Sequence, residues 1–369
     1  MRILILNWRC PMNPQAGGAE YLTYEIAKRL VAGGDTVEWF SAAFPGAKPE
    51  EDLDGVHVVR AGRQWTVHLH AFRRYFRRLH SRFDLVIDEV NTVPFFTPLW
   101  ADVPVFLLIY QLARQVWWYE SPFPISLMGF ALEPAYLRIY RRVPAFTESR
   151  STLGDLRRLG FSGPVTVVPV GVSPVADVTR ANGEGPTFVY VGRLSRSKRV
   201  GDIIRAFEIF QRTNSGSRLW LLGDGPGRHV RGLRRLVGHL GLDGSVEFCG
   251  KVSAREKYKR MSAAHALLMA SVREGWGLVV TEANSCGTPA VAYDVAGLRD
   301  SIRHEETGLL VAPTHQALAE GMVRIWRDRP LHRRLASQAL TWSRTFSYER
   351  STEVVRSTIA NMVASGTIK

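Results

Sequence analysis

Short hydrophobic, β-rich runs alternate with amphipathic helical stretches along nearly the whole chain. In the first half this pattern predicts strands near Arg2–Trp8, Thr36–Ala42, His57–Ala61, Asp84–Glu89, Val103–Ile109, Ala145–Glu148 and Val165–Val168. A second series of predicted strands comprises Thr187–Gly192, Arg218–Gly223, Val246–Gly250, Ala266–Ala270, Pro289–Tyr293 and Gly308–Val311. Strands that alternate with helices are typical of parallel α/β sheets. We therefore expect two tandem, doubly wound, Rossmann-like domains.

A polar, glycine-rich segment separates the two series. Residues 174–186 include Asn182-Gly183-Glu184-Gly185 and have little hydrophobicity, which is typical of a linker. This places an amino-terminal domain at residues 1–173 and a carboxy-terminal domain at residues 187–346. A helical tail, residues 347–369, is expected to pack back on the first domain.

The composition is that of a globular protein with large cores, because 46% of the 369 residues are hydrophobic and 22% are charged. No stretch reaches the roughly 18 consecutive apolar residues that a membrane-spanning helix needs. The segment Met1–Arg9 is predicted to be a buried strand rather than a signal peptide. Three widely spaced cysteines give neither a disulfide framework nor a zinc site. We therefore predict a cytoplasmic protein.

The net charge of +14 favours an anionic partner, and one local excess of positive charge is sharper than the average. Residues 56–83 contain no Asp or Glu, and apolar and aromatic residues recur there at helical spacing. The arginines among them that define a basic face are Arg73, Arg74, Arg77, Arg78 and Arg82. Such a helix suits the surface of an anionic membrane, although a helix docked on its own domain has the same pattern. A second apolar stretch, Val116–Phe130, could line an acceptor groove, touch lipid or form a buried helix–loop pair.

Two loops in the second domain follow predicted strands and suit phosphate binding. Arg193 comes directly after Gly192, and Lys198 follows before the next predicted helix. Ligands of parallel sheets bind at the carboxyl ends of strands, so these two cations could clamp a diphosphate by charge-assisted hydrogen bonds. The loop Gly223–Gly227 contains three glycines that would allow a ligand close to the backbone, although a simple turn would contain them too.

A third junction, Ser271–Glu282, places two carboxylates around a glycine-rich helix start. Glu274 is expected in the loop and Glu282 about one turn into the helix. Backbone N–H groups at a helix amino terminus stabilise phosphate, and the carboxylates could accept hydrogen bonds from sugar hydroxyls. The alternative is that Glu282 only complements the helix dipole and Glu274 is a solvated loop residue.

These three motifs, in this order, resemble glycosyltransferase family 4. The resemblance rests on Gly192-Arg193-Leu194 with Lys198, on Gly223-Asp224-Gly225-Pro226, and on Glu274 and Glu282 in a Glu-Gly-Trp-Gly-Leu setting. Gly17-Gly18-Ala19-Glu20 is similar to the amino-terminal glycine motif of the family. The resemblance implies a GT-B fold with an interdomain cleft and a retaining, metal-independent transferase that uses a nucleotide-diphosphate sugar.

The resemblance also implies roles for individual residues. Arg193 and Lys198 would bind the diphosphate and stabilise the leaving nucleotide. Glu274 would hold the transferred sugar and Glu282 the ribose of the nucleotide. The remaining donor-binding positions that it implies are Gly17, Gly18, Gly192, Gly223, Lys251, Val252, Gly275, Trp276, Gly277 and Leu278. No cofactor is expected besides the donor substrate.

The chain departs from the family pattern near the predicted acceptor side. Tyr110 occupies the position at which many members carry a catalytic His, and Tyr is a poor base near neutral pH because its reference pKa is about 10. Gln111 or a group of the substrate could act instead. Glu89 and Asn91, at another strand end, are predicted to touch the acceptor, with a purely structural turn as the alternative.

Other motifs are discounted, and two alternatives to an active transferase stay open. The pair Asp52 and Asp54 has a metal-binding spacing but is expected to form a solvated turn, and His68 and His70 should lie on different faces of a helix. The alternatives are a catalytically impaired relative and a basic anion- or nucleic-acid-binding module. No specific nucleic acid is expected because most basic residues are dispersed. The donor base, the sugar and the acceptor stay open, and location at the inner membrane surface is a prediction.

Overall fold

A computed structural model describes residues 1–172 and 185–365, so most of the predicted linker lies outside the described residues. Contacts between residues divide the chain into two compact units. The first contains Met1–Arg114, Met128–Gly171 and Ser347–Lys369. The second contains Gln115–Leu127 and Val172–Phe346, so a segment between two strands of the first unit groups with the second.

The first unit is built on an eight-stranded sheet with the order β3-β4-β2-β1-β5-β6-β7-β8. Its strands are β1 (Arg2–Leu6), β2 (Thr36–Ser41), β3 (Glu50–Leu53), β4 (Val56–Arg60), β5 (Leu85–Glu89), β6 (Val105–Leu108), β7 (Ala145–Thr147) and β8 (Val165–Val167). The strand β1 lies at the centre, where Ile3 pairs with Val37 on one side and Leu85 on the other. All pairs are parallel except β3 with β4, which confirms the predicted α/β class.

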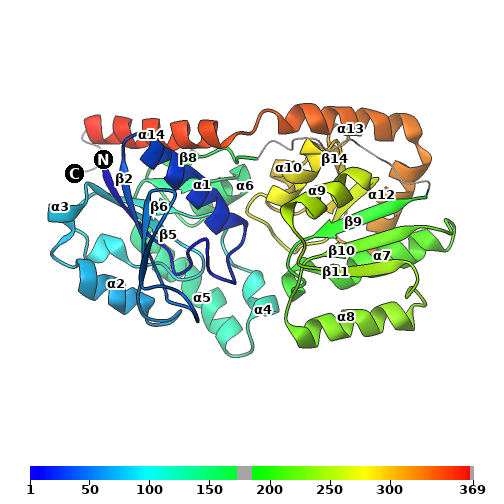
Figure 1. Ribbon diagram of the computed structural model, residues 1–369, viewed down its shortest axis with the longest axis horizontal. Coiled ribbons are helices and arrows are strands. Elements are labelled where there is room, and N and C mark those ends of the chain that lie inside the picture. The colour runs from blue at the N-terminus through cyan, green and yellow to red at the C-terminus, as the bar shows by residue number, and fades with distance from the viewer. Residues whose placement is uncertain (173–184, 366–369) are drawn as a thin grey trace. The chain divides into compact units, whose positions relative to one another are not determined.

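Helices cover this sheet on its apolar faces. They are α1 (Gly18–Ala32), α2 (Val67–Tyr75), α3 (Leu79–Arg82), α5 (Ile125–Leu137), α6 (Arg150–Arg158) and α14 (Tyr348–Ala364), with the 3-10 turns η1 (Thr97–Leu99) and η2 (Arg138–Tyr140). The carboxy-terminal helix α14 packs against α1, drawn in red beside blue in Figure 1. Ser351 of this helix donates a hydrogen bond of 2.6 Å to the carbonyl oxygen of Pro169.

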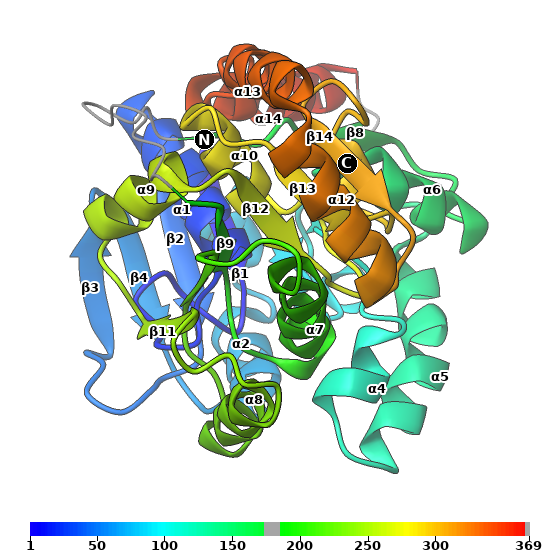
Figure 2. The ribbon, with the colours of Figure 1, turned by 90° about the vertical axis from the view of Figure 1, so that its right-hand side faces the viewer.

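The second unit contains a six-stranded, fully parallel sheet with the order β11-β10-β9-β12-β13-β14. Its strands are β9 (Thr187–Val191), β10 (Arg218–Leu222), β11 (Val246–Gly250), β12 (Ala266–Met269), β13 (Ala290–Tyr293) and β14 (Gly308–Val311). Its helical elements are α4 (Val116–Glu120), η3 (Arg196–Lys198), α7 (Val200–Gln211), α8 (Gly227–His239), α9 (Ala254–Ala263), α10 (Leu278–Ser285), α11 (Leu298–Ser301), α12 (His315–Arg327) and α13 (Arg329–Ser343). Figure 2 shows α7 and α8 beside each other, and the two helices are in contact.

The acidic segment around Asp52 differs from its prediction as a solvated turn. Glu50–Leu53 forms the edge strand β3, antiparallel to β4, and only Asp54 and Gly55 turn, both with positive φ. Alternate residues of this strand are exposed, so charged side chains at an edge are compatible with pairing. The prediction of a solvated turn was therefore wrong for Glu50–Leu53, because this segment pairs with β4, the strand on the other side of the short turn.

The predicted basic helix is interrupted. The helix α2 ends at Tyr75, Arg77 adopts a left-handed conformation with φ of 60°, and α3 begins at Leu79. A continuous helix would place Arg73 beside Arg77 and Arg74 beside Arg78, and like charges four residues apart destabilise a helix. The break separates these pairs while Tyr75 and Leu79 stay buried.

No helix among the described residues is long and apolar enough to cross a membrane.

Candidate functional site

Two glycine loops of the second unit lie against each other at the carboxyl ends of β9 and β10. Gly192 and Gly223 both have positive φ, of 152° and 132°. A methyl group on Gly223 would lie 1.9 Å from the carbonyl oxygen of Gly192, so only glycine fits there. The amide of Leu194 also donates to the carbonyl oxygen of Asp224 at 2.8 Å. These contacts fix the backbone of the predicted phosphate-binding loops.

The two predicted cations lie on and just after this loop. Arg193 is exposed, and the hydroxyl of Tyr190 donates a hydrogen bond of 2.7 Å to its carbonyl oxygen. Within residues 1–172 and 185–365, the guanidinium of Arg193 forms no ion pair, so its charge is open to a ligand. Lys198 ends the turn η3, and Arg199 adopts a left-handed conformation before α7 begins.

The structure brings Lys198 and Glu274 together. Their side chains form an ion pair of 2.5 Å, although the residues lie 76 positions apart. Glu274 also accepts a hydrogen bond of 2.6 Å from the hydroxyl of Ser271. Gly297 makes room for this arrangement, because a methyl group there would lie 2.2 Å from the carbonyl oxygen of Glu274. The cation and the carboxylate are thus held at one strand-end position.

The glycine-rich turn after Glu274 leads into α10. Gly275 lies in this turn, and Gly277 caps α10 with φ of 92°, so the amides of Leu278 and the following residue begin the helix without an earlier helical partner. The ring of Trp276 is buried: its indole N–H donates to Thr281, and it packs edge-on against Phe346. Trp276 can therefore offer its backbone to a ligand, but its ring serves the core.

Three further predicted donor-binding residues, Glu282, Lys251 and Val252, belong to the second unit. Glu282 lies on α10 and forms an ion pair of 2.8 Å with Lys257 of α9. Lys251 is exposed directly after β11, and Val252 packs against the core. The amide of Gly223 donates to the carbonyl oxygen of Gly250 at 2.8 Å, which places the end of β11 beside the glycine loop.

Glu120 of α4 is a site residue that the sequence did not indicate. Its carboxylate accepts hydrogen bonds from the amide of Ser197, at 3.0 Å, and from the Ser197 hydroxyl. Burial raises the pKa of Glu120, but these hydrogen bonds and the nearby charge of Arg193 hold it below its usual value. Glu120 therefore stays ionised and holds the turn that carries Lys198. No local motif could reveal this contact between residues 77 positions apart.

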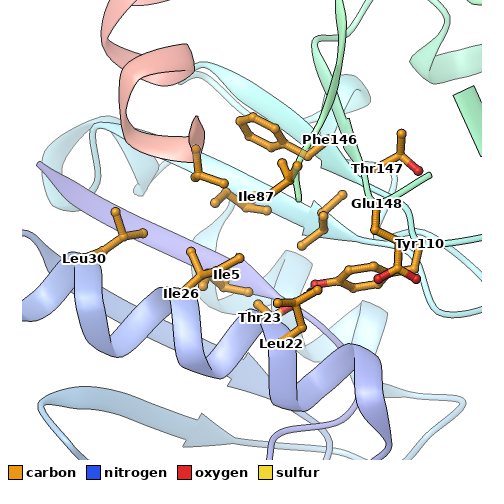
Figure 3. A pocket seen from close by; sticks show the side chains of 13 residues that line it. Ile5, Leu22, Thr23, Ile26, Leu30, Ile87, Tyr110, Phe146, Thr147 and Glu148 are labelled. Atoms are coloured by element: carbon orange, nitrogen blue, oxygen red, sulfur yellow. The ribbon is translucent and has the colours of Figure 1, made fainter. Parts of the chain in front are cut away.

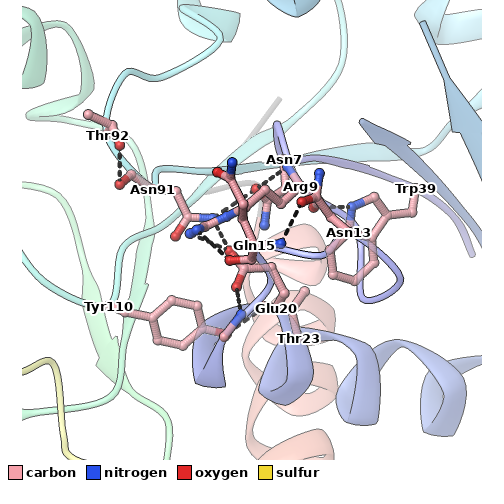
Figure 4. A network of polar contacts seen from close by, with 11 residues as sticks. Asn7, Arg9, Asn13, Gln15, Glu20, Thr23, Trp39, Asn91, Thr92 and Tyr110 are labelled. Atoms are coloured by element: carbon pink, nitrogen blue, oxygen red, sulfur yellow. Dashed lines mark hydrogen bonds and ion pairs between the residues drawn. The ribbon is translucent and has the colours of Figure 1, made fainter. Parts of the chain in front are cut away.

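In the first unit, a polar network surrounds the glycine motif at the start of α1 (Figure 4). The carboxylate of Glu20 accepts hydrogen bonds from the amide of Gly17 at 2.7 Å and from the side chain of Asn91 at 2.8 Å. It also forms an ion pair of 2.7 Å with Arg9. Asn91 donates as well to Asn7, so the predicted acceptor residue holds the interior of the network together. Gly17 and Gly18 are exposed beside it.

Arg9 and Asn7 were not singled out from the sequence, although a signal for them exists. Both directly follow the buried strand β1, and the carboxyl ends of parallel strands are where ligands bind. The same rule indicated Glu89 and Asn91 after β5.

Tyr110 is buried and faces the interior of the first unit (Figure 3). Its hydroxyl lies 2.6 Å from the hydroxyl of Thr23 on α1. Both residues line a small, mostly apolar cavity of about 30 Å³, bounded also by Ile5, Glu148 and Val355. Burial raises the pKa of Tyr110 well above its usual value, so the phenol stays protonated and is no base at neutral pH. This placement gives Tyr110 a role in joining β6 to α1.

Glu89 is also buried, with only 1% of its surface exposed. Burial and the nearby carboxylate of Glu20 raise its pKa well above the usual value, which favours the neutral form of this carboxyl group. A direct contact with an acceptor would require this side chain to become uncovered. Gln111 is half-buried, and its side-chain oxygen is buried without a hydrogen-bond partner.

The described residues contain no group of three or more His, Cys, Asp or Glu side chains that could hold a metal ion. The two discounted pairs have other partners: His57 contacts Asp52, and His68 contacts the carbonyl oxygen of Val93.

The two parallel sheets and their glycine-rich strand ends are compatible with a glycosyltransferase, and comparison with known proteins agrees. Residues 16–175 match the family model described as Glycosyltransferase Family 4, and residues 175–342 match the model described as Glycosyl transferases group 1. Together these matches span most of the chain. The chain belongs to the group 1 glycosyltransferases of family 4, as the motifs predicted.

Similar proteins support the same class. Glycogen synthase from Mycobacterium tuberculosis is 28% identical over 92% of this chain and 90% of its own length. Other curated relatives match over shorter stretches, in which this chain covers 18%, 39% and 40% of their lengths. Among solved structures, sucrose-phosphate synthase from Thermosynechococcus elongatus has a TM-score of 0.83 at 22% identity, covering 99% of each chain. The Anabaena protein HepE in complex with UDP-glucose has a TM-score of 0.76 at 19% identity, covering 98% of this chain and 100% of that one.

Proposed function

We propose that this protein is a retaining glycosyltransferase that transfers a sugar from a nucleotide-diphosphate donor. The ion pair between Lys198 and Glu274 is the observation that carries the proposal. A cation suited to a diphosphate lies next to a carboxylate suited to sugar hydroxyls, in the unit that also contains the two glycine loops in contact. HepE was solved with UDP-glucose, and a donor of the same chemical class fits the polar groups of this chain.

The reaction breaks the bond between the anomeric carbon and the phosphate oxygen and forms a bond to an acceptor hydroxyl oxygen. In the proposed mechanism, the proton of that hydroxyl passes to the leaving phosphate on the same face of the sugar, and the nucleoside diphosphate departs. Arg193 and Lys198 stabilise the negative charge that develops on the diphosphate. No side-chain nucleophile is required, which is compatible with the neutral, buried Tyr110 and Glu89.

Donor binding would rearrange one contact. Lys198 pairs with Glu274 in this structure, and both are mostly buried. In the complex, Lys198 would turn its charge to the diphosphate while Glu274 accepts hydrogen bonds from the sugar. We propose that Arg193, Lys198 and the amides that begin α10 neutralise the diphosphate in place of a metal ion.

The test is release of nucleoside diphosphate from UDP-glucose, and then from GDP-, ADP- and TDP-sugars, in the presence of candidate acceptors. We expect one donor to be turned over by the wild type and not by Glu274→Ala. Glu320→Ala, which removes an exposed glutamate of α12 from the same unit, is the matched control. Turnover that survives Glu274→Ala would contradict the proposed site, and absence of turnover with every donor would favour a catalytically impaired relative.

We further propose that the first unit works at the surface of an anionic membrane and takes a lipid-linked acceptor. Four of the five predicted arginines, all except Arg74, are exposed, and Arg73, Arg77 and Arg78 form no ion pair among the described residues. Arg74 and Arg82 instead pair with Glu50 at 3.2 Å and Glu38 at 3.0 Å, which reduces the free charge. Exposed apolar side chains accompany these arginines on α2 and its flanks: Trp65, Leu69, Phe72 and Phe76. Cations beside exposed aromatic rings suit the headgroup region of a bilayer.

The helix α5 presents a second apolar surface in the first unit. Met128 and Leu132 expose 56% and 52% of their surface. The helix carries one charged residue, Glu133, which is buried and accepts hydrogen bonds from the amides of Ala113 and Arg114. An exposed helix face without charges is unusual in water and is compatible with contact to the lipid part of an acceptor.

Flotation with liposomes tests the membrane proposal. We expect binding to vesicles that contain phosphatidylglycerol, and loss of most of it in Arg73→Glu/Arg77→Glu/Arg78→Glu. The control Arg141→Glu/Arg142→Glu/Arg150→Glu changes the same charge at exposed positions elsewhere in the first unit. Equal binding by both triple variants would contradict a specific membrane face.

A further inference from the structure

The helix α8 of the second unit carries a concentration of positive charge that the donor site does not use. Its thirteen residues contain no Asp or Glu. They include four exposed arginines and two histidines: Arg228, Arg231, Arg234, Arg235, His229 and His239. Across the part of the chain that the structure describes, none of these arginines forms an ion pair, whereas many arginines elsewhere do. This helix is therefore a surface with unsatisfied positive charge.

Beside this helix, a groove of about 530 Å³ runs along the junction of α7 and α8. The residues that line it include the small or apolar residues Gly201, Leu233 and Leu236. A methyl group on Gly232, which also lines the groove, would meet no atom within 4 Å, so the space above it is open. The volume falls in the range of ordinary small-molecule sites, about 300–1,000 Å³.

The groove is lined by cations from both helices. Arg199 and Arg205 come from the start of α7, and Arg235 comes from α8. Asp202 is the acidic neighbour on α7, but it is already engaged: it pairs with Arg199 at 2.6 Å and accepts a hydrogen bond of 2.9 Å from Tyr293. It lies 3.8 Å from Arg205, so it neutralises that charge weakly. The lining itself contains no carboxylate.

A buried polar atom in the lining also lacks a partner. The Nε2 atom of His229 is buried and makes no hydrogen bond within the described structure. A buried polar atom without a partner costs free energy, and a ligand group in the groove could satisfy it. His239 lines the same groove from the last turn of α8.

We propose that this groove binds a phosphate-bearing ligand, at a site separate from the donor. Neither Lys198 nor Glu274 lines it. Planar guanidinium groups bind phosphate oxygens through paired hydrogen bonds, and here they flank the groove from two helices. Leu233 and Leu236 supply apolar surface in the same groove, beside the charged side chains. A free polyphosphate and a phospholipid headgroup share this chemistry.

The experiment compares two charge reversals on the same helix. Arg235→Glu changes a lining residue, whereas Arg231→Glu changes an exposed arginine of α8 that does not line the groove. Both are made in an Arg193→Ala background so that the donor loop contributes less binding. Titration calorimetry with inorganic tripolyphosphate measures affinity, and thermal melting confirms that each variant is folded.

We expect tripolyphosphate to bind about tenfold more weakly to Arg235→Glu, with little change for Arg231→Glu. Vesicles of phosphatidylglycerol, tested in an Arg73→Glu/Arg77→Glu/Arg78→Glu background, distinguish the sources. A loss of vesicle binding specific to Arg235→Glu would identify a lipid headgroup, and a response limited to tripolyphosphate would identify a soluble ligand. Equal losses in both variants, or no binding of either probe, would overturn the proposal.

Discussion

The strand ends of the two units use similar polar residues for different purposes. In the second unit, Arg193 is exposed and without an ion pair among the described residues, and Gly223 lets its loop pack against Gly192. In the first unit, Glu20, Arg9 and Asn91 satisfy one another in a closed network. The second unit therefore leaves a positive charge exposed at a strand end, whereas the first unit uses its polar groups to hold its own loops in place.

The largest expected effect concerns the strand ends of the second unit. Lys198→Ala removes the cation proposed to bind the diphosphate and leaves Glu274 without its ion pair. We expect kcat to fall about 10²–10³-fold, as when one preorganised donor to a developing charge is removed. Steady-state kinetics with the active nucleotide sugar measures it. Lys259→Ala, on the helix α9 of the same unit, should leave kcat unchanged, and equal losses in the two variants would contradict the role of Lys198.

The next effect concerns the glycine loops. Gly223→Ala forces a methyl group to within 1.9 Å of a carbonyl oxygen at a φ of 132°, so we expect the free energy of unfolding to fall by about 3 kcal/mol or more. Chemical denaturation measures this loss. Gly216→Ala has a positive φ of 77° but meets no atom within 4 Å, so it reports the backbone cost alone, about 1 kcal/mol. Similar losses in both variants would show that the loops do not touch.

Glu120 tests whether the segment 115–127 serves the donor site. Glu120→Gln loses part of the charge-assisted bonding to Ser197, so the turn with Lys198 should loosen. We expect the KM for the donor to rise about three- to tenfold with a smaller change in kcat. Tyr119→Phe, at the exposed neighbouring position, is the control. An unchanged KM would show that Glu120 does not affect donor binding through the turn that carries Lys198.

The pH dependence of stability tests the closed interior of the first unit. Because the pKa of Glu89 is raised in the folded state, its contribution is fully favourable below its unfolded pKa and declines as pH rises above it. The Glu89→Gln variant cannot ionise at this position. Its free energy of unfolding relative to the wild type should therefore increase between about pH 4.5 and pH 7. The increase should be about 1.4 kcal/mol for each unit by which the pKa of Glu89 differs between the folded and unfolded states. Melting curves across this range measure it. A difference that does not change with pH would contradict a neutral, buried Glu89.

Tyr110 gives the smallest expected effect. Tyr110→Phe removes the contact with Thr23, and we expect a loss of about 1 kcal/mol in the free energy of unfolding. The pH profile of kcat should stay unchanged, since the phenol does not ionise near neutral pH. A shifted acidic or basic limb in Tyr110→Phe would instead restore a catalytic role for this residue.

The sequence predicted the strands well because they depend on local signals. The second-unit strands end within one residue of the predicted positions, and strand-end position also indicated Lys198 and Glu274, which the structure brings together. The features that the sequence did not predict depend on contacts with residues far away in the chain. The edge strand β3 needs β4 to pair with, and Glu120 needs Ser197.

The acceptor side was harder to predict for a related physical reason. A strand-end residue can contact a ligand only if its side chain is exposed. The hydrophobic pattern of the sequence does not determine whether a single polar side chain is exposed or buried. Glu89 and Asn91 were correctly placed at a strand end, yet one is buried and the other is bonded to Glu20 and Asn7.

Direct binding of the donor decides whether the second unit holds a nucleotide sugar. Titration of the wild type with UDP-glucose, followed by GDP-, ADP- and TDP-sugars, should show one nucleotide sugar that binds without added metal. The same ligand should bind at least about tenfold more weakly to Arg193→Ala, which loses a charge-assisted contact to the diphosphate. Equal affinity in the wild type and Arg193→Ala, or binding of no nucleotide sugar at all, would contradict a donor site at these strand ends.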